Sequence, residues 1–223
     1  MGAAVSMDGV DDYISLPSLE VTGYEISLTA WVKNSSFPTN VAQRFIAKAS
    51  DATEAGSYWV LGQTSTSGQN RLFFRLKSGN VTRTLAASTG NLPLNAWYHV
   101  AATYDGARMR LYLNGAEVGS LKKTGALSRG TGVPLHIGRS PEGSNYMRGA
   151  IDDVRVYRAG LSKYEVSRII ELAGSTTTNP PPTVSLSSPA SGANYTAGTT
   201  ISVSATAADA NGTIARVQFY AGS

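Results

Sequence analysis

Aspartates gather in two parts of the sequence and are the residues best suited to hold a metal ion. Asp8, Asp11 and Asp12 lie near the start, and Asp152 and Asp153 follow about 140 residues later. Carboxylates and main-chain carbonyl groups are the oxygen ligands that Ca²⁺ prefers. A simpler interpretation is that Asp11 and Asp12 form a turn and that Asp153 is a solvated strand residue. A shared metal site requires that the fold bring the two parts together.

A second set of side chains is suited to contact sugars. Residues 71–77 alternate between the two faces of a predicted strand, and the face away from the core carries Phe73 between two arginines. Arginine forks bind carboxylate or sulfate groups, and aromatic rings stack on the apolar face of a pyranose. An ordinary solvated sheet face explains the same pattern. The candidate ligand-binding residues are Trp59, Arg71, Phe73, Arg75 and Tyr146.

Residues that could perform catalysis are sparse. The chain has no cysteine, which excludes disulfides, thiolate zinc sites and cysteine nucleophiles. His99 has no acidic residue within reach by local spacing, so we expect a buried histidine with satisfied ring nitrogens rather than a general base. His136 has no stronger claim. Of the three tryptophans, Trp31 and Trp97 are expected in the core, and the position of Trp59 is ambiguous.

The elements that must position these residues are predicted to be strands. Residues 97–104 alternate with a period of two and are rich in aromatic and β-branched side chains, which is typical of a half-buried strand. Asp105-Gly106 is a turn pair, a second strand covers 108–113, and Asn114-Gly115 is another turn pair. Two strands closed by such turns predict an antiparallel hairpin. The predicted fold class is all-β.

Four ordered segments of the sequence resemble the laminin-G-like, or concanavalin A-like, jelly-roll domains of bacterial secreted proteins. These segments are 6–14, 26–32, 95–115 and 149–157, and Ala-Gly-Leu-Ser at 159–162 follows the last of them. The resemblance covers about residues 3–172. It implies a two-sheet antiparallel jelly-roll sandwich, a fold that hosts lectins, adhesion modules and enzymes alike.

The resemblance also implies where the aspartates lie. In a jelly roll the first and last strands run side by side, and related glucanases and lectins carry a structural calcium at that junction. The matching positions are Asp8, the carbonyl group of Gly9, and Asp152. Glucanases of this fold place their catalytic acids on one strand as Glu-x-Asp-x-(x)-Glu, and no glutamate of this chain lies in that pattern. We therefore expect a non-catalytic domain, with a structural Ca²⁺ as one alternative and plain turn residues as the other.

The sequence divides into three parts. Residues 1–172 form the predicted jelly-roll domain, which ends in a short helix begun by the capping-box pair Ser162 and Glu165. Residues 173–182 are a Thr/Pro-rich linker, since three prolines favour an extended spacer. Residues 183–223 resemble the N-terminal part of a bacterial immunoglobulin-like domain.

Strands are predicted in this last part at 183–189, 200–207 and 214–220. A complete immunoglobulin-like sandwich needs about seven strands in about 100 residues. We therefore expect the chain to be a fragment of a longer protein. Its tail is predicted to be poorly ordered, or to rest against the first domain or a neighbouring molecule.

Charge and composition narrow the function. The net charge is +4, from 19 basic and 15 acidic residues, and no Lys/Arg cluster indicates nucleic acid as a partner. The same charge is compatible with an acidic polysaccharide. No apolar run approaches the roughly 20 residues that cross a bilayer, and no secretory signal begins the chain.

The predicted function is non-catalytic binding of a polysaccharide or other glycan. The chain is expected to be one module of a secreted or cell-surface bacterial protein, from which the signal peptide has been removed or of which this chain is an excised piece. One rival is an adhesion or structural module that contacts proteins. Another is a glycoside hydrolase or polysaccharide lyase with an unfamiliar active site.

Overall fold

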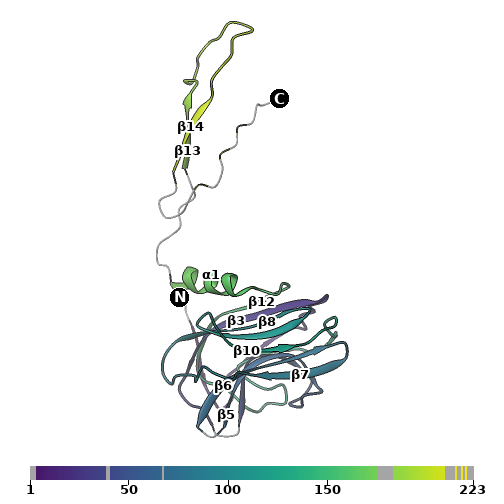
Figure 1. Cartoon of the computed structure of the whole chain (residues 1–223). Coiled ribbons are helices and arrows are strands. Elements are labelled where there is room, and N and C mark those ends of the chain that lie inside the picture. Colours follow the sequence, from purple (N-terminus) through teal and green to yellow (C-terminus); the bar gives the residue numbers. More distant parts are fainter. Residues whose placement is uncertain are drawn as a thin grey trace. The chain divides into compact units, whose positions relative to one another are not determined.

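The computed structural model describes residues 4–38, 41–66, 68–174 and 183–208, together with residues 214, 217 and 219. The chain divides into two compact units, Met1–Gly174 and Ser175–Ser223 (Figure 1). In the described part of the first unit, two six-stranded antiparallel sheets stack face to face. The predicted all-β, two-sheet antiparallel sandwich is thus confirmed.

The first sheet contains the predicted hairpin, and it also contains the first and last strands of the sandwich, which pair with each other. β1 pairs with β12, so that Val5 lies opposite Ile151 and Asp8 opposite Arg148. The first and last strands therefore run edge to edge, as the resemblance implies. In order across the sheet, the strands are β1 (Val5–Asp8), β12 (Arg148–Tyr157), β3 (Glu25–Asn34), β8 (Tyr98–Asp105), β9 (Arg108–Leu113) and β10 (Ala116–Lys122).

The turn residues of the hairpin act as the sequence predicts. A carboxylate oxygen of Asp105 accepts hydrogen bonds from the N–H groups of Ala107 (3.0 Å) and Arg108 (2.7 Å). Asn114 and Gly115 have positive φ angles of 49° and 78°. Such a pair of left-handed residues forms the tight turn that matches the twist of a two-stranded ribbon.

The second sheet carries most of the residues predicted to bind a ligand. Its short strand β11 lies between β2 and β4, and His136 stands opposite Ser15 on one side and Ala47 on the other. In order across the sheet, the strands are β2 (Ile14–Leu16), β11 (Leu135–Ile137), β4 (Ala42–Ala49), β5 (Ser57–Thr66), β6 (Gln69–Ser78) and β7 (Val81–Ala86).

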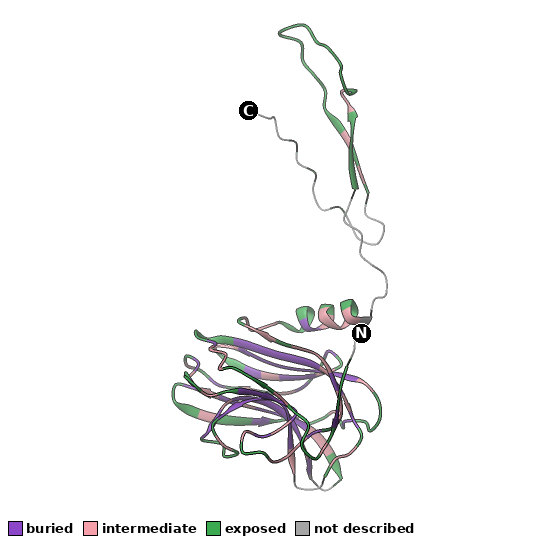
Figure 2. Cartoon of the chain, turned by 180° about the vertical axis from the view of Figure 1, so that it is seen from behind, coloured by how far each residue is buried: buried purple, intermediate pink, exposed green. Residues whose placement is uncertain are grey.

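The core lies between the sheets and is built from alternate residues of both (Figure 2). In β8, Tyr98, Val100, Ala102 and Tyr104 are fully buried and share one cluster with residues of the second sheet, as the alternation predicts. Each large apolar side chain buried in this way contributes about 1.5–3 kcal/mol to stability. The alternation of apolar residues along the strands therefore gives each sheet one apolar face, and the two apolar faces pack together.

Helix α1 (Lys163–Gly174) covers the outer face of the first sheet (Figure 1). The N–H group of Ser162 donates to a carboxylate oxygen of Glu165 (2.8 Å), and the N–H group of Glu165 donates to Ser162 Oγ (3.3 Å). This is the predicted capping box. Val166 is fully buried against Tyr112 of β9. Across the described residues, no helix has the length and apolar character that spanning a membrane requires.

The second unit contains an antiparallel pair, β13 (Thr183–Ser188) and β14 (Ser204–Ala208). The strand predicted at 200–207 thus begins four residues later than expected. The strand predicted at 214–220 falls mostly outside the described residues. Val184 and Leu186 are 67% and 56% exposed, since the described part of this unit has no second layer to bury them.

Candidate ligand-binding surface

The side chains of β6 alternate between the core and the outer face of the sheet, as predicted, but the outer face is not open to solvent at Phe73. Phe74 belongs to the core between the sheets, whereas Phe73 packs in a separate cluster on the outer face. Arg75 shares that face, with its guanidinium carbon 5.4 Å from the centre of the Phe73 ring. The expectation of an open aromatic ring is wrong, because Phe73 is only 3% exposed. The other members of its cluster are Ala42, Ala47, Ala49 and Val60.

The covering segment is the loop Ser50–Gly56 between β4 and β5, which we call the roof loop. The carbonyl oxygen of Ala52 accepts hydrogen bonds from Arg44 Nη2 (2.7 Å) and Arg75 Nη1 (3.1 Å). The roof loop therefore folds back over the outer face of the second sheet. Arg71 lies nearer the other end of β6, where its Nη2 donates to a glutamine side chain two residues away (2.9 Å).

The three tryptophans are distributed differently from the prediction. Trp59 is 2% exposed and belongs to the core, so its ring is not available to a ligand. Trp31 and Trp97, which were expected in the core, are half-buried. The reason is register: Trp31 pairs with His99 on the outer face of the first sheet, whereas Trp59 pairs with the core residue Leu76.

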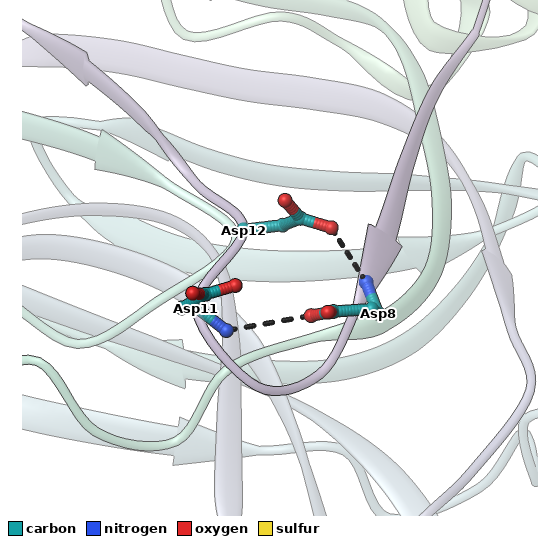
Figure 3. A group of neighbouring side chains, drawn as sticks. All are labelled: Asp8, Asp11 and Asp12. Atoms are coloured by element: carbon teal, nitrogen blue, oxygen red, sulfur yellow. Dashed lines mark hydrogen bonds between the residues drawn. The ribbon is translucent and has the colours of Figure 1, made fainter.

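Asp8, Asp11 and Asp12 form one acidic group in the turn after β1 (Figure 3). Each offers a carboxylate oxygen within 4.8 Å of the others, and all three residues are exposed. Asp8 accepts hydrogen bonds from the N–H groups of Val10 (2.7 Å) and Asp11 (3.3 Å), and Asp12 accepts one from the N–H group of Asp8 (3.0 Å). The N–H group of Val10 is the main cause that lowers the pKa of Asp8. These contacts fit a turn, and the oxygen atoms also fit a hard cation.

Asp152 does not join this group, and here the predicted ligand set of Asp8, Gly9 and Asp152 is wrong. Asp8 lies opposite Arg148, and Asp152 is four residues further along β12, opposite Trp31. At about 3.3 Å per residue, that separation is roughly 13 Å. The carboxylate of Asp152 instead accepts a hydrogen bond from the N–H group of Asp153 (2.7 Å).

Four side chains from two distant parts of the chain meet at the β2 edge of the second sheet, and we call them the rim cluster: Tyr13, His136, Arg139 and Tyr146. The guanidinium carbon of Arg139 lies 3.5 Å from the centre of the Tyr13 ring, which is a close cation–π contact. The Tyr13 ring centre is 6.0 Å from that of His136 and 6.4 Å from that of Tyr146. Tyr13 is 43% exposed, so the cluster presents an aromatic surface to solvent.

The rim cluster also holds unused hydrogen-bond donors. Arg139 Nη2 lies 3.1 Å from His136 Nε2, and this nitrogen must be the acceptor because a guanidinium can only donate. Burial, and next the charge of Arg139, lower the pKa of His136, so the ring is neutral at neutral pH. His136 Nδ1 and Arg139 Nε have no hydrogen-bond partner among the described residues.

Of this cluster, only Tyr146 belongs to the residues predicted from the sequence to bind a ligand. Tyr13 lies inside the first of the four family-like segments, but nothing local marks it as a contact. Arg139 and His136 reach it only because β11 pairs with β2, and that pairing joins residues about 120 positions apart. The sequence signal that would have indicated Tyr13, His136 and Arg139 is the presence of aromatic and cationic residues beside the short strands.

His99 is 1% exposed and lies on the outer side of the first sheet. Its ring centre is 5.5 Å from that of Trp31, in an edge-to-face arrangement. Neither ring nitrogen has a hydrogen-bond partner among the described residues, so the expectation of satisfied nitrogens is wrong. Burial lowers the pKa of His99 to about 4. A neutral imidazole sealed from solvent is poorly placed to exchange a proton with a substrate.

Comparison with known proteins agrees with this architecture. Residues 8–167 match the family described as the concanavalin A-like lectin/glucanases superfamily, and residues 182–223 match the bacterial Ig domain family. Domain 4 of an extracellular arabinanase from Geobacillus stearothermophilus, solved in complex with arabinotriose, has a TM-score of 0.54 at 20% identity and covers 74% of this chain and 75% of that one. The binding domain of botulinum neurotoxin serotype G has a TM-score of 0.53 at 16% identity, over 79% and 48% of the two chains. At these identities the likeness shows the fold alone.

Two curated relatives are much longer than the region they share with this chain. Pappalysin-1 of Mus musculus is 35% identical over 127 residues, which are 52% of this chain and 8% of the relative. Adhesion G-protein coupled receptor V1 of Danio rerio is 24% identical over 146 residues, 64% of this chain and 2% of the relative. The family match, by contrast, extends over most of the sandwich. The chain therefore belongs to the concanavalin A-like lectin/glucanase superfamily.

Proposed function

We propose that the sandwich is a non-catalytic module that binds a glycan through the rim cluster, within a secreted or cell-surface protein built from several modules. The observation that carries this proposal is the exposed Tyr13 ring, with Arg139 stacked on it and Tyr146 beside it. Tyrosine rings offer apolar faces to the C–H face of a sugar. Arginine offers a planar set of donors to hydroxyl or carboxylate oxygens.

Two further observations support the proposal. The arabinanase domain that shares the fold was solved with an arabinose oligomer, and that enzyme is extracellular. The net charge of +4 favours binding to neutral or acidic polymers over basic ones. The buried, neutral state of His99 supports binding rather than catalysis.

The test is affinity electrophoresis in gels that contain alginate, laminarin, xylan or agar. Tyr13→Ala and Tyr146→Ala are each expected to weaken binding about fivefold, since one lost aromatic contact is worth about 1 kcal/mol. Tyr24→Ala is the matched control, because Tyr24 is 61% exposed and lies outside the rim cluster. Melting temperatures should agree among the three variants.

Equal retardation of all three variants would contradict a role for the rim cluster. If the parent chain binds none of the polymers, the rival function of a protein-contacting adhesion module is favoured. Release of reducing ends or unsaturated sugars by the parent chain would contradict the non-catalytic part of the proposal.

A further inference from the structure

Three cationic side chains stand together on the outer face of the second sheet, beneath the roof loop. They are Arg44 of β4 and Arg75 and Lys77 of β6. Arg44 is only 2% exposed, and burial, followed by the charge of Arg75, lowers its pKa. A guanidinium nevertheless stays protonated at any ordinary pH. The sheet therefore carries a buried positive charge with another beside it.

These cations face main-chain oxygens rather than carboxylates. Arg44 and Arg75 both donate to the carbonyl of Ala52, and Lys77 Nζ donates to the carbonyl of Ala55 (3.0 Å). Among the described residues, none of the three cations forms an ion pair. Buried charges are usually compensated by an opposite charge. The direct contacts here are to neutral carbonyl dipoles, and the carboxylates of Asp51 and Glu142 influence Arg44 without forming an ion pair with it.

Part of the donor capacity of the two arginines is unused. The Nε atoms of Arg44 and Arg75 are buried and have no partner among the described residues. A carboxylate or sulfate binds a guanidinium through two parallel N–H···O bonds, which a single carbonyl oxygen cannot make. The donors under the roof loop therefore suit an anion better than the backbone that now occupies them.

The roof loop is held by hydrogen bonds rather than by apolar burial. Its residues 52–55 are exposed, so it adds no large apolar side chain to the sheet. Inside the loop, Asp51 accepts a hydrogen bond from the N–H group of Thr53 (2.7 Å). A Cβ atom at Gly56 would clash with the Asp51 carboxylate, so an alanine there would have to displace that side chain. Segments with exposed hydrogen bonds and little apolar burial open at low free energy.

We infer that the roof loop covers an anion-binding site on the outer face of the second sheet, and that the ligand displacing it is a polysaccharide with carboxylate or sulfate groups. Arg44, Arg75 and Lys77 bind the anionic groups. Phe73, beside Arg75, and its apolar cluster accept the apolar face of a sugar ring. This inference rests on the proposed glycan-binding function and adds a second site and a ligand class to it.

The main experiment shortens the roof loop. Residues 51–55 are replaced by two glycines, which leaves a short hairpin connection between β4 and β5. Binding is measured by affinity electrophoresis in alginate, dextran sulfate and uncharged dextran. The shortened chain is expected to bind alginate, dextran sulfate or both at least about tenfold more tightly, because a closed cover reduces the apparent affinity by the fraction of open molecules. The polymer with the larger gain identifies the anionic group as carboxylate or sulfate.

Two point variants in the shortened chain locate the effect. Arg75→Gln should remove the gain, whereas Arg108→Gln should change it less than about twofold, since Arg108 is an exposed arginine of β9 in the first sheet. The inference is overturned if shortening produces no gain, if the gain survives Arg75→Gln, or if uncharged dextran or duplex DNA gains equally. Loss of binding in Tyr13→Ala together with no effect of shortening would refute this site and leave the proposed function intact.

A second variant keeps the inference testable if the shortened chain does not fold. Gly56→Ala displaces the Asp51 carboxylate and should loosen the roof loop. We expect faster amide hydrogen exchange at residues 51–56 together with tighter binding of the anionic polymers. Faster exchange without tighter binding overturns the inference. Unchanged exchange also overturns it, because the loop would then be a fixed part of the sandwich.

Discussion

Lys48 Nζ lies 2.8 Å from a carboxylate oxygen of Glu20, although the side chain of Lys48 is 1% exposed and that of Glu20 is 32% exposed. The ammonium group also donates to Ser18 Oγ (2.8 Å) and to the carbonyl oxygen of Val133 (3.1 Å). The hydrogen bond from Lys48 is the main cause that lowers the pKa of Glu20. This pair ties β4 to the segment between β2 and β3.

The two members of this pair are predicted to respond differently to mutation. Glu20→Ala should lower the free energy of unfolding by about 3 kcal/mol, because it leaves a buried cation without its carboxylate. Lys48→Met should lower it less, because a buried charge is replaced by an apolar chain of similar length. Urea denaturation of both variants measures the difference. Equal losses, or a larger loss for Lys48→Met, would contradict this account.

The buried ring of His99 predicts a loss of stability in mild acid. Its folded pKa is lowered to about 4 from the ordinary 6.5, with Asp153 and Arg155 as the charged groups that influence it. The unfolded chain therefore binds this proton at a higher pH than the folded chain. The contribution is complete above pH 6.5, and about 3 kcal/mol is lost as the pH falls toward 4.

His99→Phe removes this titration and keeps a ring beside Trp31. The free energy of unfolding of the variant should fall less than that of the parent between pH 6.5 and 4. Urea denaturation at several pH values in that window compares the two. Parallel curves for parent and variant would show that His99 is not the source of the acid sensitivity.

The capping box predicts how firmly α1 covers the first sheet. Ser162→Ala removes the acceptor for the N–H group of Glu165, and a lost cap costs about 1 kcal/mol. The expected readout is a lower free energy of unfolding with little change in the fold. Ser162→Thr, which keeps a hydroxyl oxygen, should retain most of the stability. A loss as large in the threonine variant would point to a cause other than the cap.

The expectation of a structural calcium stays a prediction, and it can be tested at the acidic group of Asp8, Asp11 and Asp12. Ca²⁺ in hundredfold excess over its dissociation constant should stabilise the parent chain by about 2.7 kcal/mol, and EDTA should reverse the effect. Asp8→Asn should abolish this response, because Asp8 belongs to the acidic group after β1. Asp152→Asn should retain it, since Asp152 lies elsewhere on β12. A parent chain indifferent to both Ca²⁺ and EDTA would exclude a stabilising site.

The strands and turns could be predicted because their causes are local. The alternation in 97–104 and the turn pairs at Asp105 and Asn114 depend on neighbouring residues, and β8 and β9 lie within two residues of their predicted bounds. What covers a sheet face is not a local property. Phe73 is buried against Ala42, Ala47, Ala49 and Val60 of neighbouring strands, and the alternation along β6 does not reveal these contacts.

The candidate site was only partly predictable for the same reason. Tyr146 is among the predicted residues, but nothing local singled it out, and its neighbours Tyr13 and Arg139 lie more than 100 positions apart in the sequence. The prediction that Asp8 and Asp152 lie together was wrong in the register of the strands, not in the strand order. The expected strands β1 and β12 are paired, but Asp8 lies opposite Arg148. A family resemblance gives the strand order, whereas a ligand set depends on single-residue alignment.

The pairing of β1 with β12 has a consequence for biosynthesis. β1 leaves the ribosome before the other strands of the sandwich, and Arg148, the residue opposite Asp8, is translated 140 codons after Asp8. β12 also separates β1 from β3, so the first sheet stays unfinished until translation of the sandwich is nearly complete. Such non-local closure places folding in the range of about milliseconds to seconds. During that wait the nascent chain has an open strand edge at β3, the point at which a chaperone or a second nascent chain would meet it.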